Sequence, residues 1–113
     1  MLSIYIYLFI YTKAFVLFIV QIIDGKKNTA RELIEAIDEE NQIVKLRVID
    51  GELKQQYKDM LVTIQVEDHG DKHLVTWIME YEKLNENIPD PVTLVELAIR
   101  ITKDIESHHH EKK

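Results

Sequence analysis

The stretch LVTWIMEYEKLNENIPDP, Leu74 to Pro91, decides the fold, because a regular apolar alternation fills its first half and then stops. Every second position carries a large apolar side chain: Val75, Trp77, Met79 and Tyr81. The positions between them end in Glu80 and Glu82. A period of two residues is typical of a β-strand that buries one face. We therefore predict a strand here, whose apolar face contacts either a packed core or a ligand cavity.

Two upstream segments show the same alternation, and short polar turns separate them. The segments are Ile43–Ile49 and Tyr57–Glu67, and the turns are Asp50–Leu53 and Asp68–His73. Each segment gathers its apolar side chains on one face: Val44, Leu46 and Val48, then Met60, Val62, Ile64 and Val66. Strands joined by turns of this length predict an antiparallel meander.

The apolar spacing changes to that of a helix after Pro91. The residues that follow this spacing are Leu94, Leu97, Ala98, Ile101 and Ile105. Asp90 is a candidate N-cap, and Pro91 suits the first helical position. We predict a helix of roughly 17 residues that packs one face against the sheet.

The segment Thr29–Asn41 is ambiguous when its residues are considered alone. Its apolar residues follow helical spacing: Ala30, Leu33, Ile34 and Ile37. This pattern favours a helix, although polar turns flank the segment as they flank the predicted strands.

The first residues, Met1–Ile23, are almost entirely apolar and are about long enough to span a bilayer. Lys13 lies near the middle of this segment, where a charge costs roughly 2.5–3.5 kcal/mol on insertion. Isoleucine and leucine alternate with aromatic residues from Ile4 to Tyr11, which favours a strand. A strand of the soluble sheet, a membrane anchor and a wrong or truncated start are the three interpretations of this segment.

The composition excludes several classes of protein. The chain has 113 residues, which suggests one domain, and 14 basic against 20 acidic residues give a net charge of -6. An acidic surface argues against nucleic acid and anionic lipid as partners. The chain has no cysteine, which excludes disulfides, cysteine-based zinc sites and thiol catalysis, and which fits a reducing compartment such as the cytoplasm.

Neither a catalytic centre nor a metal site is predicted. The acidic residues are scattered, and Glu80 and Glu82 are expected to face solvent. His69 and His73 flank a turn and are expected to be exposed. The run His108–His110 cannot converge on one ion, because neighbouring residues of a helix point about 100° apart.

Several motifs together resemble the major latex proteins of plants, members of the Bet v I-type and START-like superfamily. The motifs are DGKKNTARELIEAIDEEN, VIDGEL, YKDMLVTIQV, LVTWIMEYEKLNE and ITKDIESHHH, in the order that this family shows. The resemblance covers roughly Phe15–Lys113, and the run from Trp77 to Glu86 is its most specific part. Residues 1–14 do not resemble the family, so we predict a partial family domain over residues 15–113.

The resemblance implies an α+β fold, in which a curved antiparallel sheet packs on one long C-terminal helix. About five family strands are expected, with Thr29–Asn41 as a strand bent by a bulge rather than a helix. The first strand, two short helices and the Gly-rich loop of the family are not recognisable, so the helix-grip fold is a partial one. Met1–Tyr11 is expected to supply a substitute strand.

The resemblance also implies an apolar cavity between the sheet and the helix, which binds hormone-, sterol-, flavonoid- or lipid-like molecules. The candidate lining residues are Val44, Leu46, Val48, Met60, Val62, Ile64, Val75, Trp77, Met79, Tyr81, Leu94, Leu97, Ala98 and Ile101. The Tyr81 hydroxyl and the Trp77 indole N–H are expected to orient the ligand.

We therefore expect a non-enzymatic cytoplasmic carrier, associated with plant defence and stress, that needs neither cofactor nor metal. Two alternatives remain open at this point. The chain is either a fragment without ligand function, which self-associates through an unpaired sheet edge, or a protein anchored to a membrane through residues 1–23.

Overall fold

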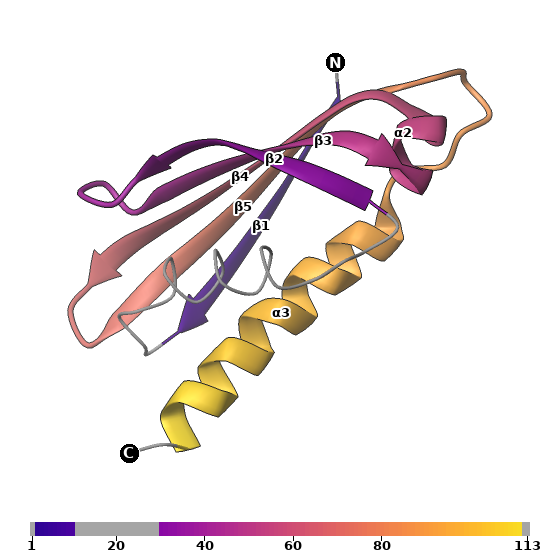
Figure 1. Ribbon diagram of the computed structural model, residues 1–113. Helices are drawn as coiled ribbons and strands as arrows, with labels where there is room; N and C mark the ends of the chain where they lie inside the picture. Colours follow the sequence, from indigo (N-terminus) through magenta and orange to yellow (C-terminus); the bar gives the residue numbers. More distant parts are fainter. Residues whose placement is uncertain (1, 11–29, 112–113) are drawn as a thin grey trace.

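A five-stranded antiparallel sheet and a long C-terminal helix form the part of the chain that this computed structural model describes, residues 2–10 and 30–111 (Figure 1). The elements are β1 (Leu2–Ile10), β2 (Ala30–Asp38), β3 (Ile43–Gly51), α2 (Glu52–Gln56), β4 (Tyr57–His69), β5 (Lys72–Lys83) and α3 (Val92–Glu111). The strand order is β1-β5-β4-β3-β2, and α3 runs across one face of the sheet. The predicted α+β fold is confirmed.

The N-terminal strand β1 takes the edge position beside β5. Its register places Ile6 opposite Trp77 and Tyr7 opposite Thr76. Because side chains alternate between the two faces of a strand, Ile6 is buried in the core while Tyr5 and Tyr7 are exposed. The predicted substitute strand is therefore present.

The other predictions for the start of the chain fall largely outside the described residues. These are the remainder of the apolar segment to Ile23, the turn at Asp24–Asn28 and the domain boundary at residue 14. None of the helices in the described ranges has the length and hydropathy needed to cross a bilayer.

The ambiguous segment is a strand, as the family resemblance implied. β2 pairs with β3 along its length, with register shifts between Arg31 and Glu32 and between Ile34 and Ala36. One bulge was predicted in this strand, and the structure has irregularities of that kind at two places. The carboxylate of Asp38 accepts hydrogen bonds from the Asn41 backbone N–H (3.0 Å) and side-chain amide (2.8 Å), which stabilises the following turn.

Two turns differ from their predicted form. The predicted turn at Asp50–Leu53 is replaced by Gly51, at φ 102°, followed by the short helix α2. The predicted loop Asp68–His73 is shorter, because β4 and β5 continue pairing to His69 and Lys72. His73 is consequently only 2% exposed, and its Nδ1 lies 2.8 Å from Asp68 Oδ1. The prediction that His73 is exposed is wrong.

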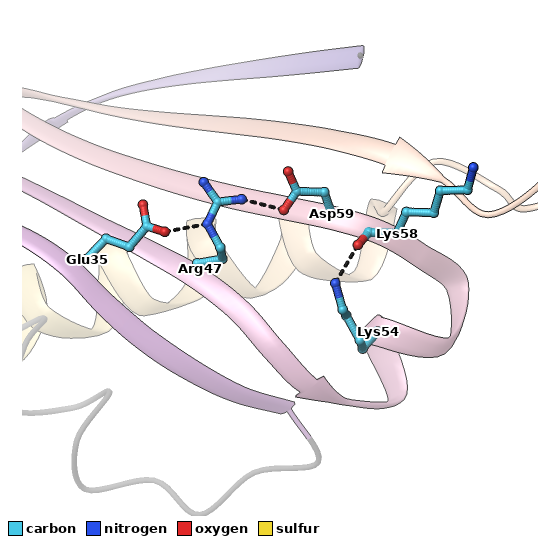
Figure 2. A network of polar contacts seen from close by, with 5 residues as sticks. All are labelled: Glu35, Arg47, Lys54, Lys58 and Asp59. Atoms are coloured by element: carbon cyan, nitrogen blue, oxygen red, sulfur yellow. Dashed lines mark hydrogen bonds and ion pairs between the residues drawn. The ribbon is translucent and has the colours of Figure 1, made fainter.

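An arginine joins three strands on the face of the sheet opposite the apolar one. Arg47 of β3 donates hydrogen bonds to Glu35 of β2 and Asp59 of β4 (Figure 2). These two partners raise the pKa of Arg47, so its guanidinium stays charged. Next to this network, the Lys54 ammonium of α2 donates a hydrogen bond to the backbone carbonyl of Lys58 at the start of β4. The ion pairs align β2, β3 and β4, whereas the apolar face supplies most of the stability.

Truncating Ile64 tests that apolar face directly. This side chain is fully buried at the middle of β4, so Ile64→Ala should lower the free energy of unfolding by about 2–5 kcal/mol. Chemical denaturation followed by circular dichroism measures the change. Ile49→Ala is the matched control, since Ile49 is 44% exposed and its loss should cost less than about 0.5 kcal/mol. Equal losses in the two variants would contradict the assignment of the core.

Candidate functional site

A small apolar cavity lies between the sheet and α3. Its volume is about 70 Å³, and residues of five elements line it: Leu46, Val48, Leu53, Val62, Trp77, Met79, Leu94, Leu97, Ala98 and Ile101. The strand residues reach it because alternate side chains of β3, β4 and β5 point to the same face. The helix residues reach it because positions three and four apart share one side of a helix.

Nine of the fourteen predicted lining residues surround this cavity: Leu46, Val48, Val62, Trp77, Met79, Leu94, Leu97, Ala98 and Ile101. The other five are buried in the core beside it: Val44, Met60, Ile64, Val75 and Tyr81. Their side chains share the same sheet face but lie beyond the cavity lining. That these fourteen residues contact a ligand stays a prediction.

Leu53 lines the cavity but was not among the predicted lining residues. Leu53 belongs to α2, a segment that was predicted to be a turn, and it packs against the core from the end of β3. The signal available was a single leucine among polar residues, and a single apolar residue does not define a helix.

A buried hydrogen bond joins β5 to the middle of α3. The indole Nε1–H of Trp77 donates to Thr102 Oγ1 at 2.9 Å, and this hydroxyl donates to the Ala98 carbonyl at 2.9 Å. Both side chains are nearly inaccessible, with Thr102 only 1% exposed. Thr102 was not predicted, although its position one turn after Ala98 places it on the buried side of the helix. This pair fixes where α3 crosses the sheet.

A second polar cluster holds the start of α3. The Tyr81 hydroxyl donates to Asp90 Oδ1 at 2.9 Å, and the Lys83 ammonium lies 2.9 Å from the same oxygen. The Tyr57 hydroxyl donates to the Pro89 carbonyl at 2.5 Å, and its ring meets that of Tyr81 edge to face.

The electrostatics of this cluster follow from its contacts. Burial, and then the hydrogen bond to Asp90, raise the pKa of Tyr81 to about 12. Lys83, and then Tyr81, lower the pKa of Asp90. The carboxylate of Asp90 thus contacts Tyr81 and Lys83. The first backbone hydrogen bond of the helix runs from Val95 N–H to the Pro91 carbonyl at 3.1 Å. Because the N-cap residue is the one whose carbonyl accepts this bond, the prediction that Asp90 is the N-cap is wrong.

The polar atoms around the cavity already have partners within the protein. The indole N–H of Trp77 and the hydroxyl of Tyr81, which were expected to orient a ligand, bond to Thr102 and Asp90 instead. Within residues 2–10 and 30–111, the structure has no buried side-chain nitrogen or oxygen without a hydrogen-bond partner. What the cavity presents to a ligand is therefore apolar surface.

The histidines do not form a metal centre in the described ranges. No group of three potential metal ligands occurs there. His73 bonds to Asp68, and His69 lies 3.5 Å from Glu67. The run His108–His110 occupies the end of α3, where the structure describes the backbone and not these side chains.

Comparison with known proteins identifies relatives over most of the chain. The sequence model of the pathogenesis-related protein Bet v 1 family matches residues 12–112. MLP-like protein 34 of Arabidopsis thaliana is 41% identical over 87 residues, which are 75% of this chain and 28% of that protein. The chain spans between 26% and 59% of the lengths of the first curated relatives it matches.

Solved structures show the same fold. A crystal structure of ginseng major latex-like protein 151 from Panax ginseng superposes with a TM-score of 0.79 and 25% identity, over 95% of this chain and 96% of that one. Norcoclaurine synthase from Thalictrum flavum superposes with a TM-score of 0.62 and 16% identity, over 95% and 87% of the two chains. The second likeness is one of fold alone.

Thr102→Val tests the bond between β5 and α3. The substitution keeps the shape of the side chain but leaves the Trp77 N–H buried without an acceptor, which should cost about 1–3 kcal/mol of stability. Thr93→Val, at an exposed position of the same helix, should change stability by less than about 0.5 kcal/mol. Denaturant titrations measure both. In a Trp77→Phe background Thr102→Val should cost much less, and an undiminished cost would contradict the pairing.

Asp90→Asn tests the cluster at the start of α3 through its pH dependence. The folded pKa of Asp90 lies below its usual 3.8, so its contribution to stability is present above pH 3.8 and is lost as the pH falls below that value. Wild type should exceed Asp90→Asn in stability at neutral pH, and the difference should shrink under acid. Asp71→Asn in the β4–β5 turn is the control. A difference that is constant with pH would exclude this role for Asp90.

Proposed function

We propose that this chain, which belongs to the pathogenesis-related protein Bet v 1 family, binds small apolar molecules without transforming them. The binding place would be the cavity between the sheet and α3. The observation that carries the proposal is the lining itself, since all ten side chains are aliphatic, thioether or indole groups. Such side chains stabilise a ligand by removing its apolar surface from water, at about 25 cal/mol per Å² before ordering costs.

The size of the cavity sets a condition on binding. Sites for drug-sized ligands measure roughly 300–1,000 Å³, so a cavity of about 70 Å³ accepts a hormone- or sterol-sized molecule only if α3 moves away from the sheet. The contacts that resist this motion are Trp77–Thr102 at the middle of the helix and the Asp90 cluster at its start. Leu53 and Leu94 line the cavity on the side of that start.

The wider role follows from the family. The pathogenesis-related description of the family supports a place in plant defence or stress responses, and a carrier of small molecules in the cytoplasm fits that role. Norcoclaurine synthase is an enzyme with the same fold, but an all-apolar lining supports binding rather than acid–base chemistry at this site.

Titration with an apolar fluorescent probe, anilinonaphthalene sulfonate, tests the proposal. We expect saturable binding with a change in emission from Trp77, because Trp77 lines the cavity and is the single tryptophan of the chain. Candidate plant hormones and fatty acids should then displace the probe. Unsaturable binding with unchanged Trp77 emission would contradict ligand binding at this site.

Leu94→Phe identifies the cavity as the place of binding. The larger ring extends into the cavity that Leu94 lines and should weaken probe binding by about tenfold or more. Val92→Phe is the matched control, since Val92 is 59% exposed on the same helix and does not line the cavity. Equal affinity of the two variants for the probe would place the binding elsewhere.

A further inference from the structure

The edge strand β1 concentrates exposed apolar side chains. Three large exposed hydrophobic residues lie on the outer face of its nine residues, Tyr5 (55%), Tyr7 (61%) and Phe9 (54%), and Leu2 (47%) is exposed at its end on the other face. The rings of Tyr5 and Tyr7 stack with their centroids 6.4 Å apart, and the Lys72 ammonium lies 4.4 Å from the centre of the Phe9 ring. A monomeric protein rarely exposes such a continuous stripe without using it.

The backbone of β1 is also available along one side. In the described ranges β1 pairs with β5 alone, so the backbone groups on its other side have no strand partner there (Figure 1). Proteins usually protect such an edge with charges, proline or bulges. The sequence of β1, LSIYIYLFI, contains no charge and no proline, and its pairing with β5 has no register shift. The opposite edge strand, β2 (ARELIEAID), carries four charged residues and two bulges.

We propose that β1 is the interface with a second copy of this chain, which pairs with it as an antiparallel strand about a two-fold axis at Ile6. Ile6 is the centre of the strand Leu2–Ile10, so this axis gives the longest overlap. The numbers of two residues that lie opposite each other in the two copies then add up to twelve. Opposed side chains project from the same face of the joined sheet.

This register is self-complementary. On the outer face Tyr5 lies opposite Tyr7 of the second copy, which forms two aromatic cross-strand pairs. On the inner face Ile4 lies opposite Leu8 of the second copy, and Ile6 lies opposite its equivalent. Both strands thus continue the core side and the solvent side of the sheet without a mismatch.

The charge distribution selects the same edge. The chain carries a net charge of -6, so two copies repel each other over most orientations. Contact through β1 brings together uncharged strands, and the Lys72 ammonium lies over the Phe9 ring. Contact through β2 would instead bring a strand with four charged residues, three of them acidic, into the interface.

The oligomeric state of the full chain tests the proposal. Sedimentation of wild type from about 1 to 100 µM should show a dimer that dissociates on dilution. Tyr5→Lys/Tyr7→Lys places like charges opposite each other in both pairs, and should raise the dimer dissociation constant at least about tenfold. Ile37→Lys/Ile49→Lys adds the same charges at exposed positions of β2 and β3, and should leave dimerisation unchanged.

A cross-link tests the register independently of those variants. The chain has no cysteine of its own, so mild oxidation of Tyr5→Cys/Tyr7→Cys should yield a covalent dimer, and oxidation of Ile37→Cys/Ile49→Cys should not. A protein that stays monomeric at every concentration overturns the proposal. This holds whether the free side of β1 is covered by another segment of the chain or by solvent. A dimer that resists the lysine pair and fails to cross-link also overturns it. If the lysine pair prevents folding, the wild-type dilution series and the cross-link decide.

Discussion

Trp77 fixes how the sheet and the long helix of this protein lie relative to each other. Its backbone lies between Ile6 of β1 and Ile64 of β4, on the interior strand β5 next to the edge of the sheet. Its side chain leaves the apolar face, lines the cavity and donates its indole N–H to Thr102 of α3. One residue therefore joins the edge strand, the central strands and the helix. A buried donor of this kind is costly to leave unpaired, which fixes where the helix crosses the sheet.

The crossing point of α3 divides one sheet face into core and cavity. Val44, Met60, Ile64 and Val75 are fully or almost fully buried beside it, whereas Leu46, Val48 and Met79 share the remaining space with the helix. The polar contacts at Trp77 and Asp90 hold the helix at two points, and the side chains between them are apolar.

Strand periodicity predicted much of this arrangement, because a half-buried strand must alternate. The strands β3, β4 and β5 and the helix α3 were predicted from their spacing alone, within a few residues at each end. The segment Thr29–Asn41 could not be assigned this way, since two bulges break its alternation and leave a spacing that imitates a helix. Only the family resemblance corrected it.

The site was less predictable than the fold, because it depends on contacts between distant segments. Alternation identifies the apolar face, but it does not say which residues the helix covers, so Val44 and Val48 were indistinguishable. Hydrogen-bond partners that are distant in sequence could not be predicted either. Thr102 accepts from Trp77 across 25 positions, and the Tyr81 hydroxyl is occupied by Asp90 rather than free for a ligand. The burial of His73 was missed because it depends on β5 pairing up to the turn.

Isotope-filtered nuclear Overhauser measurements on a complex would detect whether an apolar ligand enters between the sheet and α3. With anilinonaphthalene sulfonate bound to labelled protein, we expect contacts from the ligand to methyl groups of Leu46, Leu97 and Ile101 on both walls of the cavity. Contacts confined to the exposed residues Tyr7, Phe9 or Ile49, with none to those three, would contradict it.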